Sequence, residues 1–168
     1  MRIIYCLSIA LLVSSPAYAQ LAVELAPDQQ ALLQSSDPNL AANKKLLFDF
    51  WTEVFQTRDM SRTPDYMHED YMQHNPMVPT GRAPFVNFFG SLPKLDKKNS
   101  IDNLVTIVAE GDLVVLAFKV ECKDPRKEGA TYTTTWFDML RVKDGKVSEH
   151  WDHGTIGGSG NAPDCQRQ

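Results

Sequence analysis

The chain has 168 residues, 43% of them hydrophobic, which suits one ordinary domain with a single hydrophobic core. Its formal net charge is −4 and no stretch is strongly basic, so it lacks the electrostatic footprint of a nucleic-acid-binding protein. We therefore expect no nucleic-acid partner.

Residues 1–19 have the pattern of a secretory signal peptide. Met1-Arg2 is a short positive region, residues 3–13 form an apolar core, and Ala17-Tyr18-Ala19 is a small-x-small cleavage motif. The apolar run is shorter than the roughly 20 residues that a transmembrane helix needs. We expect cleavage after Ala19, a periplasmic or secreted protein, and no membrane contact of the mature chain; an uncleaved anchor is the alternative.

Helical periodicity dominates the first half of the mature chain. A helix capped by Asn39 or Asn43 and ending near Thr57 carries a wide apolar stripe at i, i+3, i+4 and i+7 spacing. Further helices are predicted over 63–71 and 83–90.

The second half has the composition of β-strands. Strands are predicted over 100–110, 113–122, 131–142 and 147–156, separated by turns such as Lys143-Asp144-Gly145. Helices followed by a meander of strands indicate an α+β domain. We place an N-terminal arm at 20–38, the domain at 39–156 and a flexible tail at 157–168.

Two cysteines, Cys122 and Cys165, remain after cleavage of the signal peptide. In an oxidising compartment they can pair and tie the tail to the end of a strand. The alternative is a half-buried strand thiol and an exposed tail thiol. The sequence does not show whether their Cα atoms come close enough for a disulfide, so both alternatives stay open.

The register of the last hairpin decides which side chains share a face of the sheet. A plain two-residue turn at Asp144-Gly145 pairs Asp138 with Trp151, whereas a bulged turn with Gly145 left-handed sets Asp138 opposite His150. We favour the bulged form, because it gathers the ionisable residues on one face, together with Trp136, Leu140, Ser148 and Asp152. Phe137, Met139 and Trp151 then lie on the other face.

In that register Asp138, His150 and Asp152 form a cluster that suits acid–base chemistry. Burial raises the pKa of a carboxylic acid and a nearby imidazolium lowers it, so such groups can divide the acid and base roles. The loop after Tyr71 adds His74 as a second proton carrier and Asn75 as a group that orients a substrate oxygen. A simple ion pair between Asp138 and His150 is the alternative.

Two further interpretations compete at this cluster. Histidine and carboxylate side chains at alternating strand positions can hold a divalent cation, but no known zinc motif is present and we predict no metal. Aromatic side chains can line a cavity for a flat ligand, although each also suits core packing. The predicted substrate-binding residues are Tyr71, Asn75, Trp51 and Trp136.

Four segments resemble the SnoaL-like polyketide cyclases, a family of the nuclear-transport-factor-two-like superfamily. They are 43–55, Tyr71-Met72-Gln73-His74-Asn75-Pro76, 109–115 and 140–152, which ends in Glu149-His150-Trp151-Asp152. The resemblance covers about Asn39 to Asp152. The Gln-His-Asn-Pro and Glu-His-Trp-Asp segments are typical of the subgroup described as aldol-condensation-like proteins.

The resemblance implies a cone-shaped fold, in which a strongly curved antiparallel or mixed sheet wraps around three N-terminal helices and an apolar pocket opens at the mouth. It implies acid–base catalysis without metal or organic cofactor. By motif match His74, His150 and Asp152 carry over, and Asp138 matches a position that is usually acidic. The chain departs from the family in its signal peptide, in Trp136, and in His153-Gly154.

We therefore expect an exported lyase or isomerase that makes or breaks a carbon–carbon bond, in the aldol or retro-aldol sense, in a hydrophobic, aromatic small molecule. The alternatives are a non-catalytic small-molecule binding protein of the same fold, and an epoxide or ester hydrolase. A homodimer through the outer sheet face, with Phe137 and Trp151, is a further hypothesis.

Overall fold

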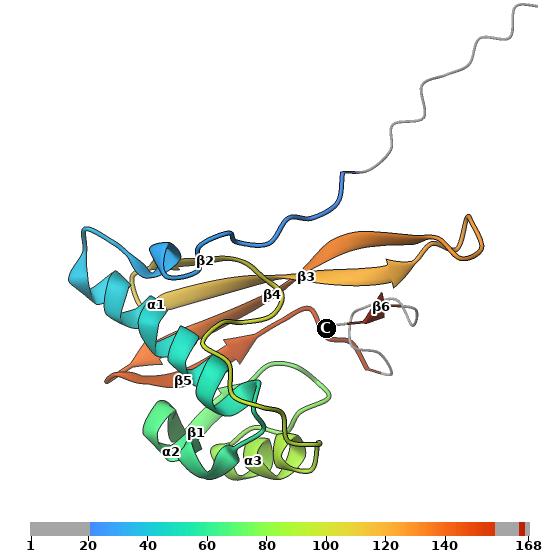
Figure 1. Cartoon of the computed structure of the whole chain (residues 1–168). Helices are drawn as coiled ribbons and strands as arrows, with labels where there is room; N and C mark the ends of the chain where they lie inside the picture. Colours follow the sequence, from blue (N-terminus) through green and yellow to red (C-terminus); the bar gives the residue numbers. More distant parts are fainter. Residues whose placement is uncertain (1–20, 157–164, 167–168) are drawn as a thin grey trace, which may run out of the picture.

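Figure 1 shows a computed structural model of the chain, which describes residues 21–156 and 165–166. The predicted signal peptide and most of the predicted tail lie outside the described residues.

The first long helix is α1 (Pro38–Phe50). It begins two residues earlier than a helix capped by Asn39 would begin. Asp37 is its N-cap and accepts a hydrogen bond from the backbone N–H of Asn39, and Pro38 occupies the first turn. The expected caps at Asn39 and Asn43 were therefore wrong, because proline with its preset φ and missing N–H suits the first helical position. A π-helical turn, η2 (Trp51–Phe55), continues the helix.

The helix predicted over 63–71 was largely wrong. The four-residue helix α2 (Thr63–Tyr66) covers only its start, and a short 3₁₀ turn, η3 (Met60–Arg62), precedes it. Strand β1 (Met67–Gln73) follows and pairs parallel to β5. Its two buried residues, Met67 and Tyr71, lie four apart, a spacing that fits a helix as well as an irregular strand. Pairing with a distant strand decided between the two.

The helix predicted over 83–90 is confirmed as α3 (Arg82–Gly90). The N-terminal arm contains one 3₁₀ turn, η1 (Ala31–Leu33). The arm lies along the sheet, since the backbone N–H of Ala26 donates to the carbonyl of Leu104 at 2.9 Å.

The remaining strands form one mixed sheet in the order β1-β5-β4-β3-β2. Their bounds are β2 Leu104–Glu110, β3 Leu113–Lys123, β4 Thr131–Lys143 and β5 Lys146–Trp151. Every pairing except that of β1 with β5 is antiparallel. The predicted strand over 147–156 ends early, at Trp151.

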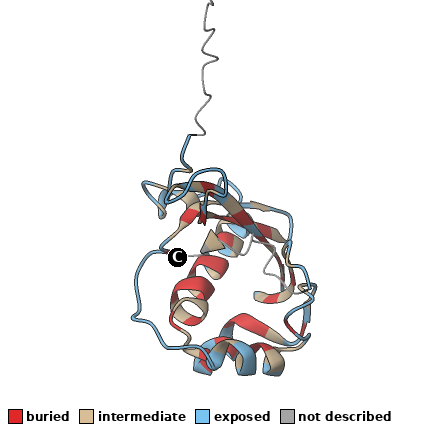
Figure 2. Cartoon of the chain, turned by 90° about the vertical axis from the view of Figure 1, so that its right-hand side faces the viewer, coloured by how far each residue is buried: buried red, intermediate tan, exposed pale blue. Residues whose placement is uncertain are grey.

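The curved sheet wraps around α1, and α2 and α3 lie beside the edge strand β1 (Figures 1 and 2). Buried residues are found on the surfaces that the sheet and α1 turn toward each other (Figure 2). At one such contact the ring of Trp51 stacks on that of Phe118 with centroids 4.8 Å apart. This is the α+β cone that the sequence indicated.

The last hairpin combines a two-residue turn with a bulge, and it corrects our register. Asp144 and Gly145 both have positive φ, 48° and 71°, as a type I′ turn requires, so Lys143 pairs with Lys146. The register then shifts between Arg141 and Val142, and Leu140, not Asp138, lies opposite His150. Because the shift is again one residue, Asp138 and His150 still lie on the same face.

The end of the chain is attached to the sheet. Strand β6 (Cys165–Gln166) pairs with β3 beyond the point where β2 ends, and Cys165 lies opposite Cys122. The two form a disulfide, with Cα atoms 3.9 Å apart. Of the two alternatives left open by the sequence, the structure has the paired one.

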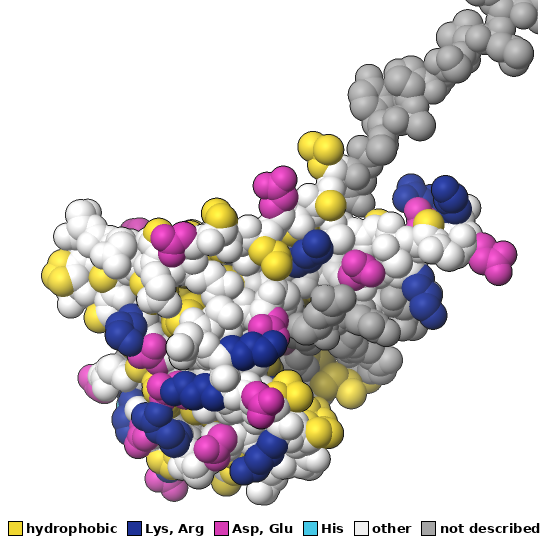
Figure 3. Space-filling view, viewed as in Figure 1, with side chains coloured by type: hydrophobic (Ala, Val, Ile, Leu, Met, Phe, Trp, Pro, Cys, Tyr) yellow, Lys and Arg dark blue, Asp and Glu magenta, His cyan; other side chains and the backbone are white. Residues whose placement is uncertain are grey.

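The face drawn in Figure 3 carries basic and acidic side chains that are interspersed, without a single-sign patch. No helix within the described residues is both long and apolar enough to cross a bilayer.

Candidate functional site

A cavity of about 690 Å³ lies between the concave face of the sheet and the helices. Most of its wall is apolar, and polar side chains from β1, β4 and β5 converge on one part of it. The lining includes Trp51, Phe55, Phe85, Phe89, Phe118, Tyr71, Gln73, Asn75, Asp138, His150 and Asp152. Such a cavity, apolar with a few placed polar groups, is typical of a small-molecule site.

Asp138 and His150 form a buried pair at this wall. The Nε2 atom of His150 lies 2.9 Å from Oδ1 of Asp138, and the two residues are 9% and 3% exposed. The indole Nε1–H of Trp136 donates to the same Oδ1 at 3.1 Å. The other carboxylate oxygen, Oδ2, is buried and has no hydrogen-bond partner among the described residues. The protein therefore holds one oxygen of Asp138, while the other is buried without a partner among the described residues.

Gln73 determines how the imidazole is protonated. Its Oε1 accepts the backbone N–H of Asn75 at 3.0 Å, which identifies that atom as the amide oxygen. The same oxygen lies 2.7 Å from Nδ1 of His150, so Nδ1 must carry a proton and donate it. The remaining ring nitrogen, Nε2, faces Oδ1 of Asp138.

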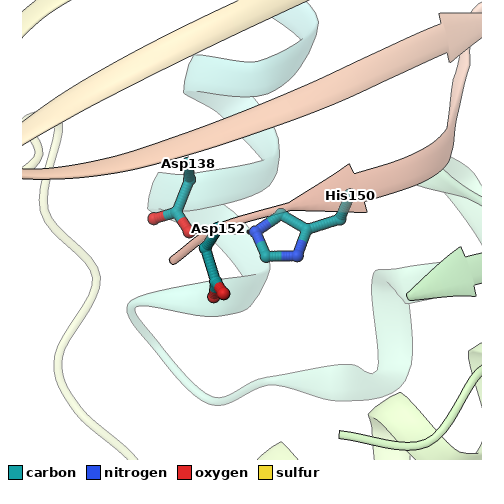
Figure 4. Close-up of side chains that lie close together, drawn as sticks. All are labelled: Asp138, His150 and Asp152. Carbon is teal, nitrogen blue, oxygen red and sulfur yellow. Dashed lines mark hydrogen bonds and ion pairs between the residues drawn. The ribbon is translucent and has the colours of Figure 1, made fainter. Parts of the chain in front are cut away.

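Asp152 is the third member of the cluster, drawn in Figure 4. Its carboxylate accepts hydrogen bonds from Nδ2 of Asn75, at 3.0 and 2.8 Å, and from the backbone N–H of Gly154 at 2.8 Å. A Cβ atom at Gly154 would lie 2.4 Å from Nδ2 of Asn75, so the close approach depends on glycine. Asn75 thus holds Asp152, whereas we expected it to orient a substrate oxygen.

Potential ligand atoms of Asp138, His150 and Asp152 lie within 4.8 Å of one another (Figure 4). A divalent cation can bridge groups at this spacing. In the structure, Nε2 of His150 contacts Asp138 and the Asp152 oxygens accept from Asn75 and Gly154. That the site uses no metal stays a prediction.

Tyr71 brings a phenol to the same part of the wall. It is 1% exposed, and its oxygen accepts a hydrogen bond from Nε2 of Gln73 at 3.1 Å. Burial raises the pKa of Tyr71 well above 10, and the nearby carboxylates of Asp138 and Asp152 raise it further. The phenol therefore stays protonated at neutral pH and is able to donate a hydrogen bond into the cavity.

His74 does not join the cluster. Its backbone N–H donates to the carbonyl of His150 at 3.0 Å, but its half-exposed side chain lies outside the cavity. There Nε2 contacts Oε1 of Glu149 at 2.8 Å and the ring stacks on Trp151 with centroids 5.0 Å apart. The contact with His74, and then Arg141, lowers the pKa of Glu149.

The two tryptophans that we predicted to bind substrate also differ in position. Trp51 lines the cavity, whereas Trp136 is fully buried behind Asp138 and reaches the site only through its indole N–H. Gln73 and Gly154 were not predicted. Correct assignment of β1 as a strand would have indicated Gln73, because alternation places it on the same face as Tyr71 and places His74 on the opposite face.

Solved structures that are similar to this chain include the following three. TsrD from Streptomyces laurentii is 18% identical, with a TM-score of 0.46, over 70% of this chain and 90% of its own. A candidate SnoaL-like polyketide cyclase from Jannaschia sp. CCS1 is 15% identical, with a TM-score of 0.49, over 71% and 90%. An epoxide hydrolase of the LEH-like type from M. tuberculosis is 11% identical, with a TM-score of 0.47, over 68% and 84%.

A search of curated protein sequences finds no significant match. The model of the SnoaL-like domain matches residues 49–150, which include β1 and the strands that carry Asp138 and His150. This match spans more than half of the chain. The protein therefore belongs to the SnoaL-like domain family.

Proposed function

We propose that this protein is an exported acid–base enzyme that breaks or forms a carbon–carbon bond next to a carbonyl group, without a cofactor, in an aromatic small molecule. The observation that carries the proposal is the Asp138–His150 pair, which lines the cavity and in which one carboxylate oxygen is held and the other is buried without a partner among the described residues. Titratable groups in such a cavity are the usual agents of proton transfer.

In the retro-aldol direction, the substrate is a β-hydroxy ketone. The Asp138 carboxylate takes the hydroxyl proton at Oδ2, the bond between the carbinol carbon and the α-carbon breaks, and an aldehyde and an enolate form. The carboxylic acid then returns the proton to the enolate α-carbon, which yields a ketone and restores the carboxylate. His150, protonated at both nitrogens in this state, stabilises the carboxylate across the 2.9 Å contact.

Tyr71 has the role of an oxyanion stabiliser in this scheme. Its phenol stays neutral because burial raises its pKa, so it donates a hydrogen bond to the oxygen of the developing enolate. Asp152, held by Asn75 and Gly154, lies close enough to fix the position of the substrate hydroxyl.

Two features support export. The first is the signal-peptide pattern of residues 1–19, and the second is the Cys122–Cys165 disulfide, a bond typical of oxidising compartments. N-terminal sequencing of protein from a periplasmic or culture fraction is expected to begin at Gln20. An intact Met1 in a membrane fraction would contradict this part of the proposal.

Release of 4-nitrobenzaldehyde from 4-hydroxy-4-(4-nitrophenyl)butan-2-one tests the retro-aldol step, and hydrogen–deuterium exchange at the α-carbon of 2-tetralone tests proton abstraction alone. We expect both activities in the wild type and a loss of at least about 100-fold, equivalent to ~2.7 kcal/mol, in Asp138→Asn.

The matched control is Asp65→Asn, which removes an exposed carboxylate of α2 and should keep both activities. Exchange without aldehyde release would retain the acid–base chemistry and overturn the carbon–carbon step. Tight binding of 2-tetralone, returned without deuterium, would identify a binding protein instead.

A further inference from the structure

The segment of residues 73–75, at the end of β1, lies beside residues 150–152, at the end of β5. The two strands are parallel, and Gln73 is paired with His150. Partners in parallel strands alternate together between the two faces of a sheet. The first and third residues of both segments line the cavity, and the middle residue of the first segment lies outside it.

On the cavity face the two segments are joined by side-chain hydrogen bonds. Oε1 of Gln73 lies 2.7 Å from Nδ1 of His150. Nδ2 of Asn75 donates to both oxygens of Asp152, at 3.0 and 2.8 Å. The backbone N–H of Asn75 donates to Oε1 of Gln73 at 3.0 Å, which links the two contacts. The segment 73–75 therefore holds two members of the ionisable cluster.

The middle residue, His74, is held on the opposite face of the sheet. Its ring stacks on that of Trp151 with an interplanar angle of 6°, and its Nε2 lies 2.8 Å from Oε1 of Glu149. Both partners also contact Arg141 of β4, whose Nε–H donates to Glu149 at 3.0 Å and whose guanidinium carbon lies 5.4 Å from the ring centroid of Trp151. His74 thus fastens the segment 73–75 to the outer surface of β4 and β5.

We propose that His74 is a positioning residue for the acid–base cluster. Anchored on the outer face of the sheet, it fixes the segment 73–75, whose two amide side chains hold His150 and Asp152 on the inner face. Such fixation matters, because a displacement of about 1 Å can cost ~100-fold in rate. The assignment rests on the proposed function and deepens it, since it explains how the reacting groups of that site are held. In this role His74 contacts no reacting atom, unlike the proton carrier that we expected.

His74→Ala removes both outer contacts and is the first test. We expect kcat for deuteration of 2-tetralone to fall at least about tenfold and KM to change by less than about twofold, because the side chains that line the cavity are unaltered. A second measurement needs no catalysis. Exchange of the Nδ1 proton of His150 with solvent, followed by NMR, should become at least about tenfold faster, because the hydrogen bond to Gln73 loses its support. Both are measured well below the unfolding temperature of the variant.

Two conservative variants separate positioning from a loss of bulk. His74→Phe keeps a ring that stacks, and His74→Gln keeps an N–H for Glu149, so both should keep kcat within about threefold of the wild type. The matched control is His68→Ala, because His68 lies in the same strand and its Nε2 contacts the carbonyl oxygen of Lys143 at 2.7 Å. It should change neither kcat nor the exchange of the His150 proton. An unchanged His150 proton in His74→Ala, or a loss of kcat that neither conservative variant reduces, would overturn the assignment.

The outcome is separable from that of the proposed function. If Asp138→Asn deuterates 2-tetralone as fast as the wild type, the catalytic proposal fails, and faster exchange of the His150 proton in His74→Ala still supports the positioning role. If Asp138→Asn abolishes deuteration while His74→Ala keeps both the rate and the His150 proton of the wild type, only the positioning role fails.

Discussion

The catalytic potential of this site comes from one buried carboxylate whose two oxygens have different surroundings. Trp136 and His150 contact Oδ1 of Asp138, and Oδ2 is without a partner in the described part of the chain. Gln73 is as important as the pair itself, because it makes Nδ1 of His150 a donor and leaves Nε2 for the carboxylate. Removal of that amide is expected to leave Nδ1 of His150 without its acceptor.

Gln73→Leu is therefore predicted to slow 2-tetralone exchange at least about tenfold, equivalent to ~1.4 kcal/mol, without unfolding the protein. Nitrogen chemical shifts of the His150 imidazole, measured by NMR, should show Nδ1 fully protonated in the wild type and only partly protonated in the variant, in which Nδ1 has lost its acceptor. Gln73→Glu, which keeps an acceptor, should retain the protonated Nδ1. An unchanged imidazole spectrum in Gln73→Leu would contradict this role.

Tyr71 provides a pH test of burial. Its pKa in the folded protein lies above the ordinary value of 10, so above pH 10 the unfolded chain loses a proton that the folded chain keeps. Stability is therefore unaffected below pH 10 and decreases as the pH rises beyond it, by about 1.4 kcal/mol per pH unit for one group. Denaturant unfolding of Tyr71→Phe should show a smaller decrease; Tyr66, whose pKa burial also raises, contributes to what remains. If the free energy of unfolding decreased equally with pH in the wild type and in Tyr71→Phe, this prediction would be contradicted.

At the scale of elements, the β4–β5 hairpin aligns the cluster through two compensating features. The Asp144-Gly145 turn starts a register that would put His150 on the wrong face, and the extra residue near Ser148 shifts it by one. No single residue of the sequence marks the position of this register shift. This explains why our predicted register placed His150 on the correct face but opposite Asp138 instead of Leu140.

Gly145→Ala is predicted to destabilise the protein by about 1 kcal/mol, because φ at this position is 71°. Asp144→Asn should be tolerated, since asparagine accepts positive φ. Deletion of Ser148 should preserve a folded hairpin but turn His150 away from Asp138, and so abolish exchange. Thermal unfolding and the 2-tetralone assay measure the two effects; a deletion variant with full activity would rule out the bulge as the aligning feature.

At the scale of the molecule, the disulfide joins Cys165 to Cys122 of β3 across a sequence separation of 43 residues. Loop-closure entropy assigns a cross-link of this length about 4 kcal/mol of stability. Cys165→Ser should lower the free energy of unfolding by an amount of this order, and reductant should lower that of the wild type equally while leaving the variant unchanged. A wild type insensitive to reductant would contradict the prediction.

The outer face of the sheet carries a shallow hollow lined by Phe137, Met139 and Trp151, and the side chain of Phe137 is 49% exposed. That the protein forms a homodimer through this face stays a prediction. The molecular mass measured by sedimentation equilibrium would distinguish a dimer from a monomer.

The sequence by itself determined most of the helices and strands, the family, and the set of ionisable residues from which the cluster is drawn. Hydrophobic periodicity and turn residues act over a few neighbours, so they indicated α1, α3 and β2 to β5. The tertiary structure alone decided that 67–73 is a strand, that Gln73 makes Nδ1 of His150 a donor, and that His74 lies outside the cavity. These outcomes depend on the parallel pairing of β1 with β5, two segments more than 70 residues apart, and no local pattern specifies such a contact.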